Sequence, residues 1–182
     1  RFGPFQEQLD IVRGLWATPV GETFSYTGEH YALHEAPALP KPVQARIPII
    51  VGGSGATKTP RIAARYADEY NAFLASEEVM RERIARVRAA AEAIGRDPGT
   101  IAFSIAAATV VGRDAAELAR RAEASGSTLE RLRVAGISGS PQQAVDAIGR
   151  LGELGISRCY LQLLDPRDLE HVELIGAEVL PQ

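Results

Sequence analysis

A short run rich in glycine, Gly52-Gly53-Ser54-Gly55, is the part of this sequence best suited to chemistry. It follows the apolar run IPIIV directly and comes just before a segment with helical spacing. Free backbone N–H groups at the start of a helix bind anions, and glycine removes the side chain that would keep a phosphate away. Ser54 adds a hydroxyl donor, and Lys58 is close enough in sequence to add positive charge.

The same glycines also have a purely conformational interpretation. The run has neither the spacing of the dinucleotide fingerprint G-x-G-x-x-G nor that of the Walker pattern G-x-x-x-x-G-K-[ST]. A tight turn from strand to helix often needs a positive φ, which glycine adopts without steric cost. No nucleophile–base pair stands beside the run. Binding an anion and merely turning the chain therefore both remain open.

The three histidines give a weaker signal. His30 and His34 lie four residues apart in a segment that alternates like a hairpin, so they are too far apart to share a metal. His171 falls in the last helical segment. We expect all three at the surface or in an interface, and we predict no metal site.

Two acids and the single cysteine complete the candidates. Asp165 follows the last apolar strand, at the end where barrel chemistry occurs, and is a minor functional candidate. Asp68 is expected to order a turn between helix and strand, and Cys159, in the apolar segment SRCYLQLL, to be a small buried hydrophobe. The sequence nominates no catalytic residue.

Alternating strands and helices must position the glycine run. IPIIVGG is rich in β-branched residues, as a parallel strand buried on both faces is, and further strands are predicted in EYNAFL, IAFSIAAATVVG and SRCYLQLLD. Helical segments follow each of them, with an additional short helix expected within SGSTLERLRVAGISGS. Four βα units predict a parallel sheet with right-handed crossovers. They are too few for a closed barrel, which leaves a small open α/β sheet or half of a (β/α)8 barrel.

Spacing and capping signals define the helices. Pro60 suits a first helical turn, and the expected inner face of that helix is Ile62, Ala63 and Tyr66. Ser76 is expected to cap the next helix, which should end at Gly95 and bury Met80, Ile84, Val87, Ala91 and Ile94. Later caps are expected at Asp114 with Glu117 and at Ser140 with Gln143, and a last helix over about 169–180.

The N-terminal quarter has a different pattern. Residues 4–16 form an amphipathic helix with one apolar face, made of Phe5, Leu9, Val12 and Trp16. A short hairpin is expected around Thr27-Gly28, and the proline-rich residues 37–48 are expected to be extended. The chain begins with arginine rather than methionine, so we expect part of the parent protein to precede residue 1.

Composition excludes several classes of function. Net charge is −3, without a run of Lys and Arg, which argues against a nucleic-acid partner. No apolar stretch approaches a membrane span, which argues against a membrane protein. A single cysteine rules out an intrachain disulfide and fits a reducing, cytoplasmic location.

Taken in order, the motifs resemble the luciferase-like monooxygenase family and, more narrowly, its coenzyme F420-dependent oxidoreductase branch. The resemblance extends over nearly the whole chain and rests on GEHYAL, PKPVQARIPIIVGGSGATKTPRIAARYADEYNAF, AIGRDP, GISGSPQQAVDAIGRLGELG and VLPQ. It implies that residues 1–182 form a single domain, the C-terminal half of a (β/α)8 TIM barrel. Within it, residues 1–16 would be a helix, 17–47 an insertion and 48–182 the βα units.

The resemblance also implies a cofactor, coenzyme F420 by preference or else FMN. Its phosphate would lie against the glycine run, and the end of the next strand would form a second wall; the cofactor-binding residues would be Gly52, Gly53, Ser54, Gly55, Phe73, Leu74 and Ala75. The family strands that carry most ring and substrate contacts have no counterpart here. The expected partners are a small-molecule substrate and either a second copy of the chain or a missing N-terminal half.

Two other functions remain open. The first is a non-catalytic fragment or assembly module whose glycine turn holds a phosphorylated ligand weakly. The second is a phosphate-binding barrel enzyme that acts on an unrelated metabolite, although this would not account for AARYADEYN.

Overall fold

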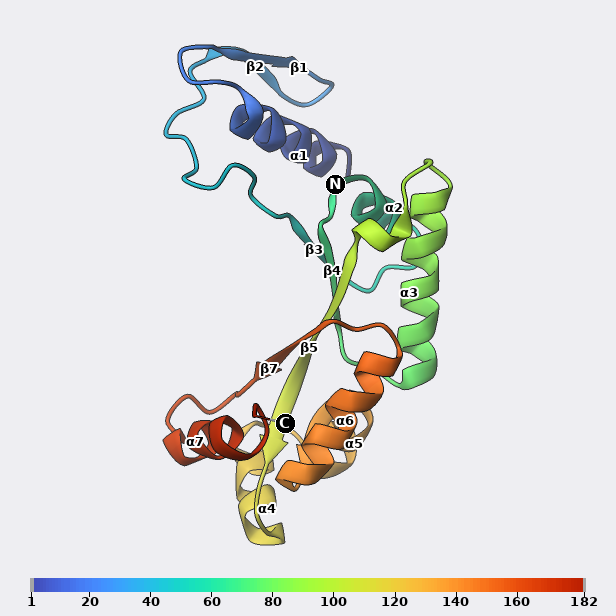
Figure 1. Ribbon diagram of the computed structural model, residues 1–182, viewed down its shortest axis with the longest axis vertical. Helices are drawn as coiled ribbons and strands as arrows, with labels where there is room; N and C mark the ends of the chain where they lie inside the picture. Colours follow the sequence, from blue (N-terminus) through green and yellow to red (C-terminus); the bar gives the residue numbers. More distant parts are fainter. Residues whose placement is uncertain (1, 182) are drawn as a thin grey trace.

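An N-terminal helix and hairpin precede alternating strands and helices in the computed structural model, which describes residues 2–181 (Figure 1). In chain order the elements are α1 (Phe2–Ala17), β1 (Phe24–Thr27), β2 (Ala32–Ala36), β3 (Ile50–Gly52), α2 (Lys58–Tyr66), β4 (Glu69–Phe73), α3 (Glu77–Glu92), the 3-10 helix η1 (Pro98–Thr100), β5 (Ala102–Val111), α4 (Ala115–Ala124), α5 (Leu129–Ala135), β6 (Gly136–Gly139), α6 (Pro141–Glu153), β7 (Arg158–Gln162) and α7 (Leu169–Glu178).

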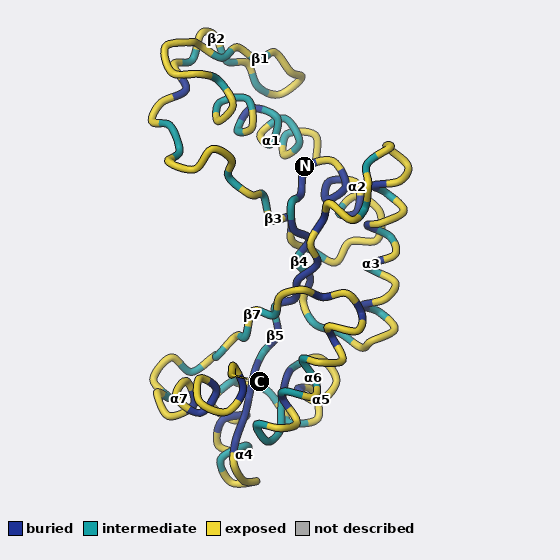
Figure 2. Tube along the Cα trace, in the orientation of Figure 1, coloured by how far each residue is buried: buried dark blue, intermediate teal, exposed yellow. Residues whose placement is uncertain are grey.

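The predicted parallel sheet is confirmed, and β5 is its central strand. The sheet runs β3-β4-β5-β6, and β7 also pairs with β5. Strand β4 pairs with the first half of β5, from Glu69↔Ala102 onward, and β7 with its middle. Strand β6 pairs with its last four residues, ending at Val111↔Gly139. Buried residues follow the path of β4 and β5 (Figure 2).

Strand β6 was not predicted, so the expectation of four strands in this sheet was too low. Residues 136–139, sequence GISG, were expected only to lie near a short helix. Two glycines in four residues give a weak local preference for strand. The segment is extended because the long strand β5 continues past the end of β4 and offers β6 free backbone partners.

The expected helix faces are largely confirmed. Ile62, Ala63 and Tyr66 of α2 are all buried, as are the predicted α3 residues other than Ile94. Ile94 is 58% exposed because α3 ends at Glu92, two residues before it. Helices α2, α3 and α6 lie on one side of the strands in Figure 1, whereas the opposite side, between α1 and α7, carries no helix in that view.

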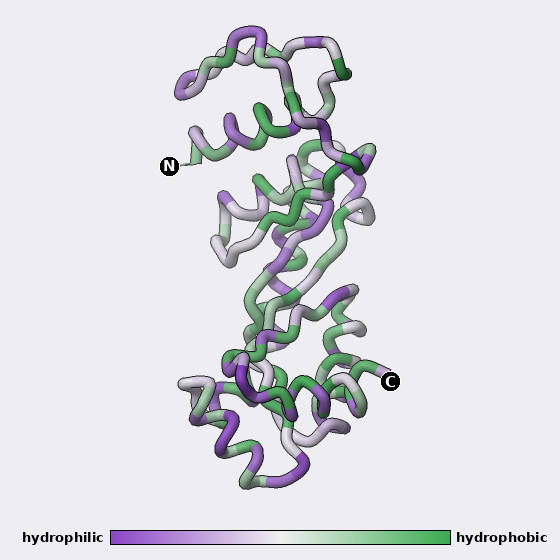
Figure 3. The backbone as a smooth tube through the Cα atoms, turned by 90° about the vertical axis from the view of Figure 1, so that its left-hand side faces the viewer, coloured by the Kyte–Doolittle hydropathy of each residue, from purple (hydrophilic) through white to green (hydrophobic). Residues whose placement is uncertain are grey.

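Helix α1 is amphipathic, as its turn-by-turn change of hydropathy shows (Figure 3), but much of its predicted apolar face is exposed. Phe5 and Trp16 are 42% and 37% exposed, and the buried residue is Ile11. The helix packs on only a narrow strip of α2 and of the β1–β2 hairpin, which forms at Thr27-Gly28 as predicted. Glu7 joins the helix to the hairpin, because its carboxylate accepts hydrogen bonds from the backbone N–H groups of residues 29–31.

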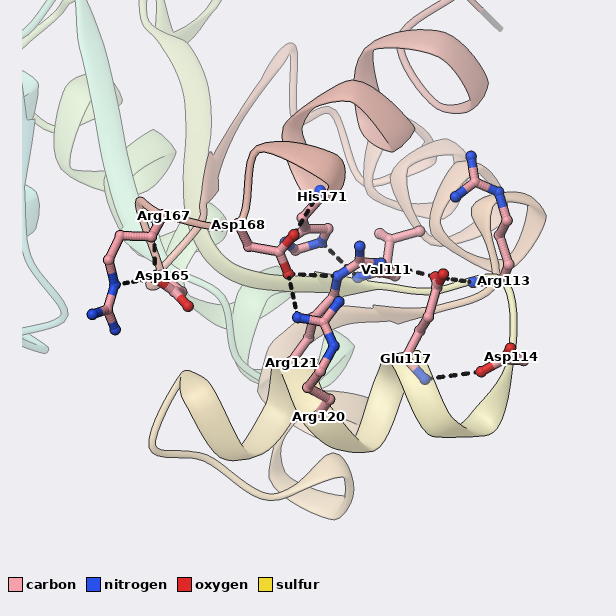
Figure 4. A network of polar contacts seen from close by, with 10 residues as sticks. All are labelled: Val111, Arg113, Asp114, Glu117, Arg120, Arg121, Asp165, Arg167, Asp168 and His171. Carbon is pink, nitrogen blue, oxygen red and sulfur yellow. Dashed lines mark hydrogen bonds and ion pairs between the residues drawn. The ribbon is translucent and has the colours of Figure 1, made fainter.

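A buried polar network holds α7 against β5 (Figure 4). His171 is 4% exposed, so the expectation that it lies at the surface or in an interface was wrong. Its Nε2 accepts a hydrogen bond from the backbone N–H of Val111 at 2.9 Å. Asp168 caps α7 by accepting from the His171 N–H, and it pairs with the buried Arg121 at 2.9 Å and with Arg120 at 3.2 Å. Because Nε2 accepts, His171 must be neutral with its proton on Nδ1.

This network lowers the pKa values of His171 and Asp168. Burial lowers the pKa of His171, and the nearby Arg121 lowers it further, while Asp168 and Glu117 act in the opposite direction. The hydrogen bond from Arg121 holds the pKa of Asp168 below its usual value although burial opposes this. Protonating His171 would remove the acceptor for Val111 and place a second positive charge beside Arg121.

We therefore expect the free energy of unfolding to fall as the pH drops from about 7 to about 5. Below its ordinary pKa of 6.5, His171 takes up a proton more readily in the unfolded chain than in the folded protein. Asp168 titrates below this window in both states. Urea denaturation at several pH values measures the effect. The His171→Gln variant keeps an acceptor without the titration and should show a flatter profile; an equally steep profile would contradict this assignment.

Candidate functional site

Most of the predicted cofactor-binding residues lie together at the carboxyl edge of the sheet. Strand β3 ends at Gly52, which is in register with Asn71 of β4, and Phe73 lies two residues farther along β4. Residues 52–55 and 73–75 thus follow neighbouring parallel strands at the same edge. This is where parallel α/β folds bind ligands.

Gly53 is held by two hydrogen bonds to β4. Its N–H donates to the carbonyl of Asn71 at 3.2 Å, and its carbonyl accepts from the Tyr70 hydroxyl at 2.6 Å. Its φ of +137° is a conformation that favours glycine, and a Cβ at Gly55 would come within 2.8 Å of Thr59 Oγ1. The conformational interpretation therefore holds for Gly53, and tight packing accounts for Gly55.

Gly52 is different, because neither conformation nor packing requires a glycine there. Its φ lies outside the left-handed region, and a Cβ would meet only the Asn71 carbonyl, at 3.8 Å. The residue is exposed at the end of β3. The missing side chain leaves open space above the end of the strand, as close approach of a ligand to the backbone requires.

The N-terminus of α2 is available to an anion. The N-cap residue Thr57 makes no side-chain hydrogen bond to the first turn, and that turn carries no acid. Helices α4 to α7, by contrast, are all capped by a side chain. Helix α3 also lacks such a bond, but Glu77 and Glu78 in its first turn disfavour an anion. Lys58, expected to add charge here, lies over the Phe2 ring, 4.6 Å from its centroid.

Residues 73–75, predicted to form the second wall of the cofactor site, lie only partly beside the glycine run. Phe73 is 63% exposed at the sheet edge, and its carbonyl accepts a hydrogen bond from Arg83. Leu74 and Ala75 are half-buried and line a cleft of about 140 Å³ together with residues of α5, β6 and α6. None of residues 52–55 lines that cleft.

A polar cluster on the sheet was missed from sequence. Glu69, 6% exposed, accepts hydrogen bonds from Ser104 at 2.6 Å and from Tyr160 at 3.0 Å, and it pairs with Arg158 at 2.5 Å. Asn71 donates to Ser104 at 2.8 Å. The alternation of polar with apolar residues along EYNAF and RCYLQ was the available signal. Because Glu69 and Arg158 begin their strands, the cluster starts at the end of the sheet opposite the glycine run.

The other sequence candidates lie away from this edge or serve the fold. Asp68 was expected to order the turn between helix and strand, but its carboxylate contacts the segment before β3 instead, accepting from the Ile49 N–H at 2.8 Å and pairing with Arg46. Cys159 is half-buried, and burial raises the pKa of its thiol. Asp165 pairs only with Arg167 at 3.4 Å among the described residues. Within residues 2–181, no cluster of three or more His, Cys, Asp or Glu side chains could hold a metal.

We expect Tyr70→Phe to destabilise the protein by about 1 kcal/mol, because it removes the hydrogen bond to Gly53 from a buried hydroxyl. Hydrogen exchange should speed up in residues 52–57. Tyr31→Phe is the matched control: its hydroxyl accepts from Gln8 in an exposed pair, so its loss should cost less. Equal losses of stability, with unchanged exchange at the glycine run, would show that Tyr70 does not hold this turn.

The fold agrees with comparisons to known proteins. Residues 1–130 match the family of luciferase-like monooxygenases. An F420-dependent hydroxymycolic acid dehydrogenase from Mycobacterium tuberculosis is 33% identical over 127 residues, which is 63% of this chain and 32% of that protein. The chain thus spans about a third of the length of this relative.

Solved structures show the same fold at low identity. The F420-dependent tetrahydromethanopterin reductase of Methanopyrus kandleri superposes with a TM-score of 0.77 at 18% identity, covering 98% of this chain and 62% of that one. An F420-dependent secondary alcohol dehydrogenase gives 0.80 at 17% identity, with the same coverage. The EDTA monooxygenase of Chelativorans sp. BNC1 gives 0.74 at 20% identity, covering 97% and 57%.

These similarities favour part of a barrel over a small independent sheet. The chain aligns along nearly its whole length with about three fifths of larger enzymes of this fold. The chain therefore belongs to the luciferase-like monooxygenase family.

Proposed function

We propose that this chain supplies the cofactor-phosphate-binding part of an F420- or FMN-dependent oxidoreductase or monooxygenase. The observation that carries the proposal is the uncapped start of α2, next to a glycine that local structure does not require. Backbone N–H groups and the helix dipole at that place suit the charge of a phosphate. The open space above Gly52 lets that phosphate approach the backbone.

In this proposal each predicted residue has a physical role. Gly52, Gly53, Ser54 and Gly55 hold the phosphate, and Tyr70 keeps the turn in position. The exposed Phe73 offers an apolar wall, continued by the half-buried residues 74 and 75. The bound cofactor would supply the hydride exchange or, as reduced FMN, the reaction with oxygen, whereas the protein binds and orients it. We assign no acid–base residue, and the substrate is proposed only as a small molecule.

F420 is preferred over FMN for two reasons. The motif resemblance is closer to the F420-dependent branch, and the relative that is 33% identical is an F420-dependent dehydrogenase. A cytoplasmic location is part of the proposal and rests on the single cysteine. Among the described residues, no helix is both long enough and apolar enough to cross a membrane.

Titration of the protein with F420 and, separately, with FMN tests this proposal. We expect F420 to bind more tightly than FMN, and Gly52→Asp to weaken binding by about tenfold or more because a carboxylate repels phosphate. Gly52 is a better site for this change than Gly53, where positive φ would add strain. The matched control is Gly176→Asp, an exposed helical position with no neighbour near its Cβ.

Fluorescence of the cofactor reports the affinity, and circular dichroism confirms that each variant is folded. Binding of FMN without F420 would overturn the cofactor preference. Equal affinity of the native protein and Gly52→Asp would mean that the glycines only turn the chain.

We also propose that the chain associates, with a second copy or with a segment that continues the barrel. Among the described residues, β3 pairs only with β4, and β6 and β7 each pair only with β5, so each of these three strands has an unpaired edge. Ile50 and Tyr160, on these edge strands, are 51% and 39% exposed. Open edges and exposed apolar side chains favour pairing with another chain. An assembly module without catalysis is the alternative function that this feature supports.

Sedimentation velocity over a range of concentrations should show self-association of the isolated chain. Ile50→Lys should shift the distribution toward monomer because it places a charge on the edge strand. Val43→Lys is a suitable control, since Val43 is fully exposed and lies outside the sheet. A stable monomer at every concentration would contradict the self-association.

A further inference from the structure

Two arginines line a cavity that contains none of the proposed cofactor-binding residues. The cavity has a volume of about 410 Å³ and lies between α4, α5, β6 and α6. Arg133 and Arg150 line it from α5 and α6, and Ser138 lines it from β6. Leu118 and Leu129 form an apolar part of its wall.

The side chains that line the cavity carry a net positive charge. Both arginine residues are exposed, and neither forms an ion pair or a hydrogen bond with any described residue. Arg121 on the neighbouring helix α4 is, by contrast, held by Glu117 and Asp168. The cavity wall also contains one acid, Asp146, which already accepts a hydrogen bond from Gln142 at 2.9 Å. Two guanidinium groups against one carboxylate leave one net positive charge.

Ser138 adds a polar group without a partner. Its Oγ is shielded from solvent and makes no hydrogen bond to a described residue. The alternation of β6 places the neighbouring Ile137, which is 0% exposed, in the core and Ser138 toward the cavity. A shielded hydroxyl without a hydrogen-bond partner is unfavourable. Rotation about the Cβ–Oγ bond would let it donate to an acceptor group of a ligand in the cavity.

We propose that this cavity binds the oxyanion group, phosphate or carboxylate, of a small molecule. Arginine forms paired hydrogen bonds to both kinds of group, and Ser138 donates a further one. Leu118 and Leu129 contact an apolar part of the same ligand. The two arginines also line the smaller cleft of Leu74 and Ala75, so the site adjoins the proposed cofactor wall, but it does not depend on cofactor binding.

Calorimetric titration with inorganic phosphate and, separately, with succinate tests the site. The titrations use both the native protein and the Gly52→Asp variant, in which phosphate binding at the glycine run should be weakened. We expect saturable binding at one site per chain, weakened by about tenfold in Arg133→Gln or Arg150→Gln and by about threefold in Ser138→Ala. Arg131→Gln is the matched control, because Arg131 is also an exposed, unpaired arginine of α5 but does not line the cavity.

The anion that binds more tightly, inorganic phosphate or succinate, identifies the ligand group as phosphate or carboxylate. The proposal would be overturned if neither anion bound saturably. It would also be overturned if Arg131→Gln weakened binding as much as Arg133→Gln or Arg150→Gln. Phosphate binding that requires Gly52 would support the cofactor site and count against this one. Phosphate binding that survives Gly52→Asp but is lost in Arg150→Gln would establish this site separately.

Discussion

The pairing of β5 is the constraint on which the rest of the structure depends. This strand hydrogen-bonds to β4, β6 and β7, and no other strand of the sheet has three partners among the described residues. Elements up to α3 lie toward one end of the molecule and helices α4, α5 and α7 toward the other, with β5 running between them (Figure 1). Its ten residues are uncharged, without proline or glycine, and largely buried, as a central parallel strand must be.

Hydrogen bonds from polar groups hold the neighbouring helices and strands against β5. The backbone N–H of Val111, at the end of β5, donates to His171, and the Val111 carbonyl accepts from Arg121, so α7 and α4 are both tied to the same residue. Nearer its start, Ser104 links Glu69 and Asn71 of the neighbouring strand. Such buried polar groups are costly unless they are paired, so they restrict how the helices and strands can be arranged.

The candidate site follows from the same sheet. Parallel strands deliver their carboxyl ends to one edge, and the residues that follow β3 and β4 meet there. Within the glycine run the three glycines differ: Gly53 serves the turn, Gly55 makes room for Thr59, and Gly52 leaves space that no described residue fills. Turning the chain and leaving room for an anion are therefore compatible properties of the same four residues, and the comparisons with luciferase-like enzymes make the second one worth testing.

Local patterns in the sequence determined much of this protein. The strand that ends at Gly52, the buried faces of α2 and α3 and the caps at Asp114 and Ser140 were predictable from local patterns. The expectation that this strand is buried on both faces was wrong, because only Val51 is buried and Ile50 is 51% exposed on an edge strand. The family resemblance was also readable from motif order, and it implied the barrel fold.

What only the tertiary structure decided depends on partners distant in sequence. GISG becomes a strand because β5 offers it backbone partners, and His171 becomes buried because Val111, sixty residues earlier, meets it. The exposure of Phe5 and Trp16 likewise reflects how little of the molecule packs against α1. Local sequence patterns determined most of the helices and strands, although not β6. Three-dimensional packing decided which polar groups are paired and which surfaces and cavities are left to bind something else, because those depend on contacts that no local pattern encodes.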